Sequence, residues 1–269
     1  MDSRSSSGVK TFIVTSSKGG VGKSTVAANL AAAVAKSGRR VLLIDCDLSN
    51  RSLDMILGCE DGSLCDLFDL VAGRADVSKA VIEIERVPGL YFIPAPSFNS
   101  DSFTSEQISD ALQAAAREYS CDLILIDAPG AIDGILPLVA GAADGALVVT
   151  THQPLAVRAA EKTGYQLEEL GVSEQYLIIN NFDADGVLDG SVPGINEIID
   201  RAHVRLIGVV PESEELEEAQ SKGVLALEMR RDREHAGDSF AEIAERIFGG
   251  AMPLMSYLPE KKRRKILTI

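Results

Sequence analysis

Tryptophan is absent from the sequence, and aromatic residues make up only 5% of its 269 positions. Hydrophobic residues nevertheless account for 46%, which favours an α/β core of alanine, valine and leucine over an aromatic-rich binding platform. The chain also lacks any apolar run near the roughly 18 residues that a membrane-spanning helix needs. Its first eight residues are serine-rich without an apolar centre, which is not the pattern of a signal peptide.

Cysteine is scarce and irregularly spaced. The four cysteines stand at positions 46, 59, 65 and 121, with no C-x-x-C pair and no paired histidines nearby. This spacing is not that of a metal-ligand set. It indicates reduced thiols, most of them packing residues, and therefore a cytoplasmic protein.

Basic residues are outnumbered, since 26 lysines and arginines stand against 40 aspartates and glutamates and the net charge is −14. This balance argues against broad, non-specific binding of nucleic acid through the body of the protein, although ordinary solubility also explains it.

The length suits one α/β domain. We divide the chain into a disordered N-terminal segment at 1–9, a folded domain at 10–250 and a basic tail at 251–269.

The most informative stretch is Ser-Ser-Lys-Gly-Gly-Val-Gly-Lys-Ser-Thr at 16–25. It follows an apolar, β-branched run at 11–15, which predicts a strand, and precedes an alanine-rich run at 26–36, which predicts a helix. A glycine-rich turn between a strand and a helix forms a phosphate site, because unpaired backbone N–H groups and the helix dipole point at the anion. The sequence therefore predicts nucleotide binding.

Individual residues of this loop have separate expected tasks. The glycines at 19, 20 and 22 allow the backbone to wrap phosphates that a Cβ would hold away. Lys23 can reach the terminal phosphates and the Ser24 hydroxyl can ligate magnesium. The strict G-x-x-x-x-G-K-[ST] pattern fails at Ser17, so the alternative is a glycine-rich turn with two solvated lysines. The strand–loop–helix context favours the phosphate site.

Apolar runs and helical stretches alternate along the remaining chain. Alternation of this kind predicts an α/β fold, a doubly wound, mainly parallel sheet with helices on both faces, and the phosphate loop at its first strand resembles that of the P-loop NTPases. Ligands bind at the carboxyl ends of the strands in such sheets. The expected strands are at 40–45, 90–93, 122–127, 145–150, 175–180 and 204–210, and the expected helices are at 104–119, 154–170 and 238–248.

Two buried strands end in aspartate, at Asp45 and Asp127. Either carboxylate could serve only as a turn or helix-cap residue. With the phosphate loop upstream, a magnesium-linked role is favoured for Asp127, which Ala-Pro-Gly follows. Asp45 and Asp47 lie two residues apart at an extended strand end, so both carboxylates are expected to face the metal and the γ-phosphate.

Several segments together resemble the MinD/ParA superfamily of deviant Walker A ATPases. Lys-Gly-Gly-Val-Gly-Lys-Ser-Thr at 18–25 is similar to the family's phosphate loop, and 45–58 and 127–133 are similar to the first and second switches of the MinD septum site-determining ATPases. Residues 178–180 and 207–212 match the segments that enclose adenine in that family. The stretch at 51–58 favours the MinD branch.

The resemblance implies a set of roles for an ATP and Mg²⁺ site. Lys18 would reach across a homodimer to the partner's nucleotide, and Asp47 would orient the hydrolytic water, so Lys18, Lys23 and Asp47 would be the catalytic residues. Asn180 would read the adenine edge, although Asn181 stands where the family often has arginine. Magnesium would be held by Ser24, Asp45 and Asp127. ATP would be bound by Lys18, Gly19, Gly20, Val21, Gly22, Lys23, Ser24, Thr25, Asn180, Pro211 and Glu212.

The tail carries five consecutive basic residues followed by apolar ones. MinD proteins end in a short amphipathic helix that binds anionic membrane, so the resemblance implies a membrane-targeting segment here, although the pattern is poorly amphipathic. A solvated tail without a partner and a nucleic-acid contact are the alternatives. The candidate membrane residues are Leu258, Lys261, Lys262, Arg263, Arg264, Lys265, Ile266, Leu267 and Ile269.

As a whole, the resemblance implies an ATP-hydrolysing spatial regulator that dimerises with ATP and cycles between the cytoplasm and the inner face of the membrane. Division-site placement is the expected role. Its partners would be a division inhibitor and an ATPase activator, with Glu161 at the partner and dimer face. The alternatives are a flagellar-number regulator, a ParA-type DNA-segregation ATPase, a metal-cluster carrier or reductase, and a small-molecule synthetase on the same scaffold.

Overall fold

The computed structural model describes residues 8–48, 51–60, 62, 65–96, 102–130, 134–229 and 236–268. Residues 49, 50 and 131–133 of the expected switches lie outside this part of the chain, as do Ile269 of the tail and residues 1–7 of the N-terminal segment.

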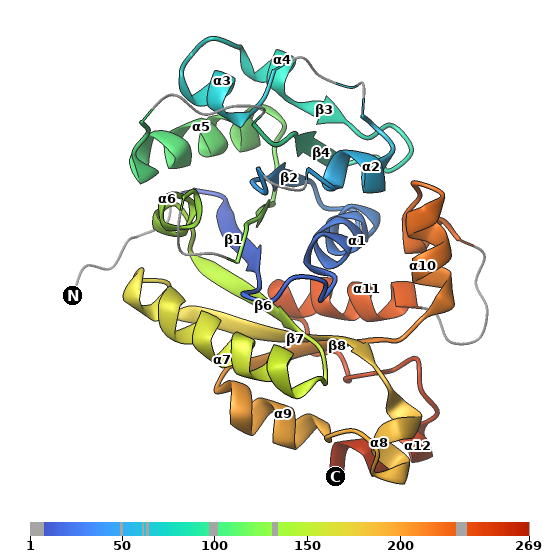
Figure 1. Cartoon of the computed structure of the whole chain (residues 1–269). Helices are drawn as coiled ribbons and strands as arrows, with labels where there is room; N and C mark the ends of the chain where they lie inside the picture. Colours follow the sequence, from blue (N-terminus) through green and yellow to red (C-terminus); the bar gives the residue numbers. More distant parts are fainter. Residues whose placement is uncertain are drawn as a thin grey trace.

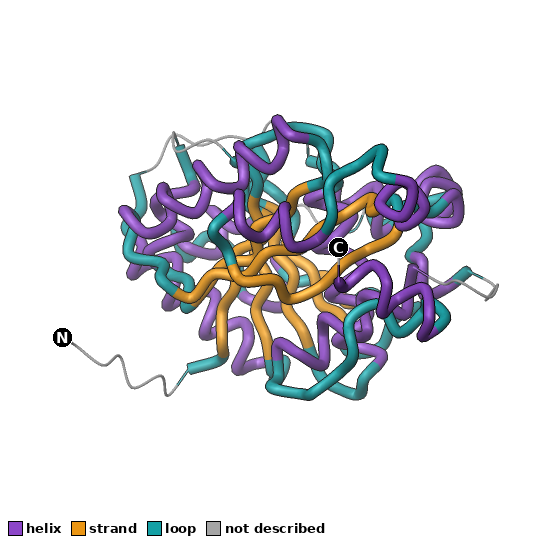
Figure 2. The backbone as a smooth tube through the Cα atoms, turned by 90° about the horizontal axis from the view of Figure 1, so that it is seen from below, coloured by secondary structure: helices purple, strands orange, loops and turns teal. Residues whose placement is uncertain are grey.

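The described strands form one sheet of eight, in the order β3-β4-β2-β5-β1-β6-β7-β8. Neighbouring strands run parallel except for β3 and β4 at one edge, which run antiparallel. Figure 2 shows helices on both sides of this sheet, so the expected α/β architecture is confirmed. The strands are β1 (Lys10–Thr15), β2 (Val41–Asp45), β3 (Ile82–Glu83), β4 (Leu90–Ile93), β5 (Leu123–Asp127), β6 (Gly145–Thr150), β7 (Glu174–Phe182) and β8 (Arg205–Pro211).

Side chains alternate between the two faces along each strand, which produces two apolar cores. Ile13 of β1 packs into one core, whereas Phe12 and Val14 pack into the other. The second core contains α1 (Lys23–Lys36), α2 (Leu53–Leu57), α10 (Glu214–Ser221), the 3₁₀ turn η1 (Ala226–Glu228) and α11 (Ala236–Ile247). The first contains α3 (Leu67–Val71), α4 (Val77–Ala80), α5 (Ser105–Glu118), α6 (Leu136–Gly141), α7 (Pro154–Glu169), α8 (Ala184–Asp189), α9 (Ile195–Ala202) and α12 (Glu260–Thr268).

Helix α1 is buried on all sides along most of its length, from Val26 to Ala35. Its alanines allow this, because small side chains let the sheet and the neighbouring helix α11 approach closely. Figure 1 shows α11, near the end of the chain, lying against α1 near its beginning. The helix begins at Lys23, three residues before the apolar run from which we predicted it.

The C-terminal segment folds onto the body of the protein. Helix α12 packs against α8 and α9 (Figure 1), and the preceding residues Met255 and Leu258 are buried with Ile266 in the core that α8 and α9 share. We expected 251–269 to be a tail beyond the folded domain, whereas its side chains Met255, Leu258 and Ile266 are buried against the body. The reason is that α8 and α9 expose an apolar face that these few side chains cover.

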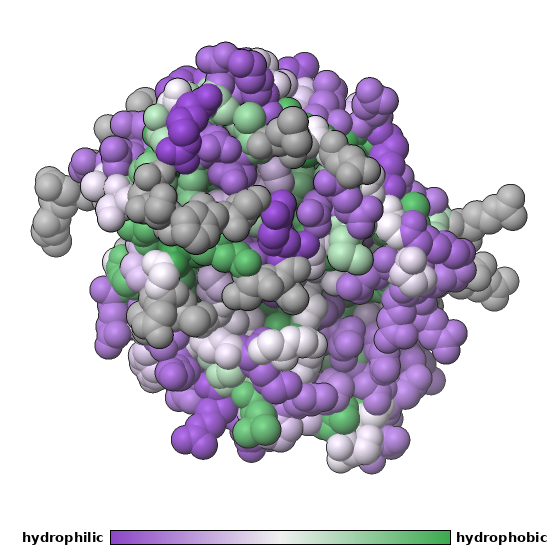
Figure 3. Space-filling model, turned by 45° about the horizontal axis from the view of Figure 1, so that its top comes forward, coloured by the Kyte–Doolittle hydropathy of each residue, from purple (hydrophilic) through white to green (hydrophobic). Residues whose placement is uncertain are grey.

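In the described residues, no helix is both long enough and apolar enough to span a membrane. The face drawn in Figure 3 is mainly hydrophilic, with hydrophobic residues in small separate patches.

Candidate functional site

A cavity of about 680 Å³ opens at the carboxyl ends of the central strands. The whole predicted phosphate loop lines it, as do residues from the segments that follow β2 and β5 and from α2, α7 and α10. These further residues include Asp47, Ile56, Pro129, Gly130, Gln166 and Gln220. The structure therefore brings the loop and the segments that follow both strand-end aspartates to a single cavity.

The loop adopts a conformation that its glycines make possible. Gly20 and Gly22 have φ values of 78° and 84°, in the left-handed region that side chains disfavour. Gly22 also lacks room for a side chain, because a Cβ there would lie 2.3 Å from the Asn180 Nδ2 atom. Asn180 in turn donates a 2.8 Å hydrogen bond from Nδ2 to the Val21 carbonyl. Asn180 thus supports the loop, a contact that we did not predict.

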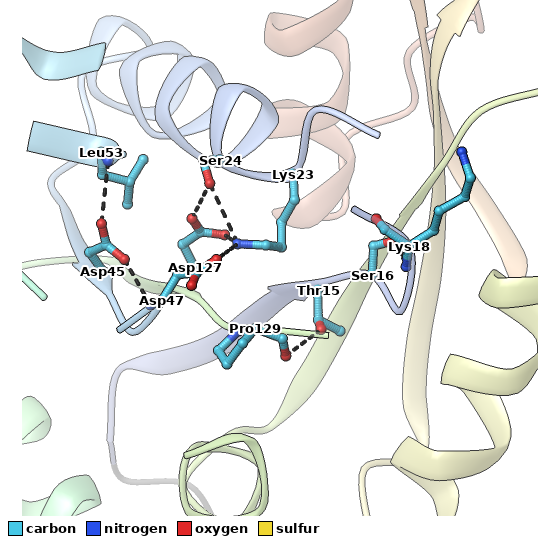
Figure 4. Close-up of polar contacts among 10 residues, drawn as sticks. All are labelled: Thr15, Ser16, Lys18, Lys23, Ser24, Asp45, Asp47, Leu53, Asp127 and Pro129. Carbon is cyan, nitrogen blue, oxygen red and sulfur yellow. Dashed lines mark hydrogen bonds and ion pairs between the residues drawn. The ribbon is translucent and has the colours of Figure 1, made fainter. Parts of the chain in front are cut away.

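Lys23, Ser24 and Asp127 form a compact polar cluster at the start of α1 (Figure 4). The Lys23 Nζ atom lies 2.6 Å from Asp127 Oδ1, and the Ser24 hydroxyl donates a 2.6 Å hydrogen bond to Asp127 Oδ2. Lys23 Nζ also lies 3.6 Å from Asp47 Oδ2. Burial raises the pKa of Asp127, while the adjacent lysine acts in the opposite direction.

Asp45 points in a different direction from the one we expected. Its Oδ1 atom accepts a 2.9 Å hydrogen bond from the Asp47 amide, and its Oδ2 atom accepts one of 3.3 Å from the Leu53 amide at the start of α2. It is buried and does not line the cavity, whereas Asp47 does. Burial, reinforced by the nearby Asp127 carboxylate, raises the pKa of Asp45 to about 7.

These residues fit a magnesium-bound polyphosphate. The glycine-rich loop lines the cavity along its whole length, and the Lys23 ammonium lies beside the buried Asp127 carboxylate. The Ser24 hydroxyl oxygen and the Asp127 oxygens are the hard donors that magnesium prefers. A divalent cation held beside Asp127 would neutralise that carboxylate and would leave Lys23 available to a terminal phosphate.

Lys18 lies apart from this cluster, and its side chain points away from the carboxylates in Figure 4. Its Nζ atom donates a 3.2 Å hydrogen bond to Gln153 Oε1, just before α7. Thr25 donates a 3.4 Å hydrogen bond to Gln220 Oε1 of α10, on the opposite wall of the cavity. Gln153 and Gln220 carried no signal in the sequence, because a single glutamine outside a motif is uninformative.

The expected adenine residues Pro211 and Glu212 lie at the end of β8. The Glu212 amide donates a 3.2 Å hydrogen bond to the Phe182 carbonyl at the end of β7, which joins the two segments. Both residues line a separate cavity of about 290 Å³, together with Tyr257, Leu258 and Lys262 of the C-terminal segment. The structure therefore places the end of the second predicted adenine segment beside the C-terminal segment, whereas Asn180 of the first contacts the phosphate loop.

The remaining predicted residues lie away from the loop. Glu161 is half-buried on α7, and its Oε1 atom is 3.9 Å from His203 Nε2 at the end of α9. In the tail, Ile266 is buried and Lys262 forms a 2.9 Å ion pair with Asp185 of α8.

All four cysteines are free thiols, with Cys46 and Cys121 buried. The described residues contain no group of three or more His, Cys, Asp or Glu side chains arranged to hold a metal ion.

The site requires glycine at position 130. The sequence indicated only that Gly130 follows Asp127-Ala128-Pro129, as a turn residue would. A Cβ on Gly130 would lie 1.6 Å from the Ser16 carbonyl oxygen. The segment after β5 therefore passes directly against the beginning of the phosphate loop. Thr15 makes a second contact there, since its hydroxyl donates to the Pro129 carbonyl at 3.3 Å (Figure 4).

Comparison with known proteins gives a consistent result. Residues 12–226 match the family model described as the CobQ/CobB/MinD/ParA nucleotide binding domain. The septum site-determining protein MinD of Synechocystis is 32% identical over 248 residues, which cover 92% of both chains.

Solved structures agree with this match. The MinD chain in the MinC:MinD cell division protein complex of Aquifex aeolicus superposes with a TM-score of 0.83 at 30% identity, over 91% of this chain and 98% of the other. MinD of Pyrococcus horikoshii, solved with Mg-ADP, gives a TM-score of 0.71 at 26% identity over 88% and 96%. The chain therefore belongs to the CobQ/CobB/MinD/ParA family of nucleotide-binding domains, on its MinD branch.

Proposed function

We propose that this protein is a magnesium-dependent ATPase that helps to place the division site, as MinD proteins do. The observation that carries the proposal is the cluster of Lys23, Ser24 and Asp127 at the mouth of a glycine cradle. Support also comes from the relatives, which are named septum site-determining proteins, one of them solved with Mg-ADP. The flagellar and DNA-segregation alternatives have no comparable support, and the net charge of −14 counts against riding on DNA.

Each residue of the cluster has a task in hydrolysis. Backbone N–H groups of the loop and the start of α1 bind the phosphates, and Lys23 neutralises charge on the terminal ones. Bound magnesium would be held by Ser24 and Asp127, with Asp45 beyond them, and would supply further neutralisation of the transferred phosphoryl group. Asp47, which lines the cavity 3.6 Å from Lys23 Nζ, would hold the attacking water in line.

Lys18 provides the proposed link between nucleotide and dimerisation. Two nucleotides brought face to face repel each other, and a lysine from each partner offsets that repulsion only while the γ-phosphate is present. In this structure Lys18 is held by Gln153 of its own chain. A single exposed hydrogen bond of this kind contributes about 1 kcal/mol, so the side chain is available to a partner.

We expect Lys18→Ala to abolish ATP-dependent dimerisation while leaving the monomer folded. Size-exclusion chromatography with light scattering, in ATP and in ADP, measures the effect, and phosphate release measures hydrolysis alongside it. Lys10→Ala is the matched control, because Lys10 is an exposed lysine paired with Glu174 at the other end of β1. A Lys18→Ala protein that dimerises with ATP as readily as the parent would refute this role.

A protein partner is proposed for α7 and its surroundings. The Aquifex structure is a complex of MinD with MinC, and here α7 presents Leu155, with 72% of its surface exposed, and Tyr165, with 55% exposed. Glu161 and Arg158 lie between them in the sequence and line a groove with Arg201 and His203. An exposed apolar residue with charges around it is typical of a protein-binding surface. We propose that a division regulator binds there.

Reversible membrane association through α12 is also proposed, and we expect it to depend on charge. The apolar side chains of Met255, Leu258 and Ile266 are buried against the body, whereas Lys261 and Lys265 are exposed. Each basic residue contributes about 1 kcal/mol near an anionic surface, so one tail is a weak anchor and a dimer provides two.

Co-sedimentation with anionic liposomes tests this contact. We expect pelleting in ATP but not in ADP, and we expect the double change Lys261→Glu and Lys265→Glu to abolish it. The same double change at Lys10 and Lys79, exposed lysines that lie away from the nucleotide cavity, is the control for net charge. Equal pelleting of the tail variant and the control would contradict a membrane role for the tail.

A further inference from the structure

Two short helices form the outer wall of the nucleotide cavity. Helix α2 contributes Ile56, and α10 contributes Gln220. Each also touches a residue of the site, since the first amide of α2, on Leu53, donates to Asp45 Oδ2 at 3.3 Å and Gln220 accepts from Thr25 at 3.4 Å. The positions of α2 and α10 therefore determine where Asp45 and the edge of the cavity lie.

The C-terminal ends of these two helices meet backbone to backbone. Gly58 caps α2 with a φ of 59°, and Gly223 follows α10 with a φ of 63°. A Cβ on Gly58 would lie 3.1 Å from the Gly223 carbonyl oxygen, and one on Gly223 would lie 3.2 Å from the Met55 carbonyl oxygen. Both positions thus favour glycine for conformation and for space.

Arg86, in the turn between β3 and β4, joins the two helix ends. Its Nη2 atom donates a 2.7 Å hydrogen bond to the Leu57 carbonyl and its Nη1 atom donates a 2.9 Å hydrogen bond to the Gly223 carbonyl. Nη1 also lies 3.5 Å from Glu228 Oε2, which accepts a 2.8 Å hydrogen bond from the Leu225 amide. A planar guanidinium can bind two carbonyls on different segments at once, which suits it to this position.

We propose that Arg86 is a positioning residue of the nucleotide site, which fastens α2 to the segment after α10 and so fixes the spacing of the cavity's outer wall. Arg86 does not line the nucleotide cavity. It binds the carbonyls at the ends of α2 and α10, and other residues of these two helices line the cavity. The inference rests on the proposed nucleotide-binding function and adds a residue that the motifs of the sequence did not include.

The stretch at 51–58, which indicated the MinD branch, gains a physical role from this contact. It contains α2 and ends at Gly58, where the helix meets Gly223 and Arg86. Without Arg86, the Leu57 and Gly223 carbonyls would lose this donor, and the hydrogen-bonded link between the two helix ends would be absent. Helices α2 and α10 would then vary more in their distance from each other, and a bound nucleotide would lose contacts with the outer wall of the cavity.

The test is titration of a fluorescent ATP analogue, with and without Mg²⁺, against the full chain and its Arg86→Ala and Arg86→Lys variants. We expect the Kd for the magnesium complex to rise by about tenfold in Arg86→Ala, as for loss of one net charged hydrogen bond. Arg86→Lys should recover part of the affinity, because a lysine can reach one carbonyl but not present a planar fork. The increase should be smaller without magnesium, since α2 acts through Asp45.

Arg74→Ala is the matched control. Arg74 is also an arginine that bonds a carboxylate and a helix carbonyl, with Nε 2.9 Å from Asp69 Oδ1 and Nη2 3.4 Å from the Phe68 carbonyl, but α3 does not line the nucleotide cavity. Urea unfolding of each variant measures any general loss of stability. We expect Arg74→Ala to bind nucleotide as the parent does.

The possible results distinguish a failure of the proposed nucleotide binding from a failure of the proposed role of Arg86. A parent chain that binds no nucleotide would refute the proposed function and the inference with it. A parent that binds, with Arg86→Ala binding equally well or Arg74→Ala equally impaired, would refute the inference alone. Should Arg86→Ala fail to fold, Arg86→Lys and Gly58→Ala decide, because each disturbs the same contact; parent-like Kd values for both would overturn the role of Arg86.

Discussion

Replacement of Lys23 with alanine is expected to abolish ATP hydrolysis and to lower the free energy of unfolding of the nucleotide-free protein by about 3 kcal/mol at pH 8. The reason is that Lys23 Nζ lies 2.6 Å from Asp127 Oδ1, and Asp127 is completely buried. Removal of the lysine leaves a buried carboxylate without its counter-charge. Urea unfolding and phosphate release measure the two effects.

The loss of stability should depend on pH. Burial already raises the folded-state pKa of Asp127, and without Lys23 that pKa rises further. A carboxylate whose folded pKa exceeds its unfolded value costs stability as pH rises, because the folded state must give up a proton that it holds more tightly. The variant should therefore differ less from the parent at pH 5 than at pH 8. A difference that is the same at both pH values would contradict this account, and Lys10→Ala serves as the control with an exposed ion pair.

Gly130→Ala should be the most damaging change at a position outside the phosphate loop. Its Cβ would lie 1.6 Å from the Ser16 carbonyl oxygen and 2.7 Å from the Ser17 Cα atom, both of them backbone atoms. Relief requires a shift of more than about 1 Å in the loop or in the segment after Asp127, and misplacement on this scale costs about a hundredfold in activity. We expect loss of nucleotide binding by isothermal calorimetry and a cost of about 3 kcal/mol in unfolding free energy.

Gly38→Ala is the control for this change. Gly38 follows α1 with a φ of 87°, and nothing lies within 4 Å of the Cβ that alanine would add. The substitution should cost about 1 kcal/mol through backbone strain alone and leave nucleotide binding intact. If Gly130→Ala were no worse than Gly38→Ala, the close approach of Gly130 to Ser16 would be without consequence.

The sequence predicted the site best where function depends on neighbouring residues. The phosphate loop lies between a strand and a helix that local patterns identify, and Asp127 ends a strand that pairs with β1. The orientation of Asp45 was harder to predict, because β2 ends at this residue and the alternation of side chains along a strand does not extend to Asp47. The two carboxylate oxygens of Asp45 bind the backbone amides of Asp47 and Leu53 instead of facing the cavity.

Contacts between distant segments could not be predicted from one sequence. Asn180 lies 159 residues from the Val21 carbonyl that it binds, and Arg86 lies 137 residues from Gly223. The short helices α2, α8 and α10 were not predicted either, since helices of five to eight residues offer too few turns for a clear apolar period. The packing of the C-terminal segment depends on α8 and α9, and neither helix was among those predicted from the sequence.

The packing of α11 against α1 has a consequence for biosynthesis. The ribosome completes α1 at Lys36 but does not reach Ala236, where α11 begins, until 200 residues later. At about 5–20 residues per second, α1 waits roughly 10–40 s before α11 is translated. Throughout that interval an alanine- and valine-rich helix face has no native neighbour, which exposes the nascent chain to chaperones and to aggregation. The native packing around α1 is therefore completed only after α11 has been translated.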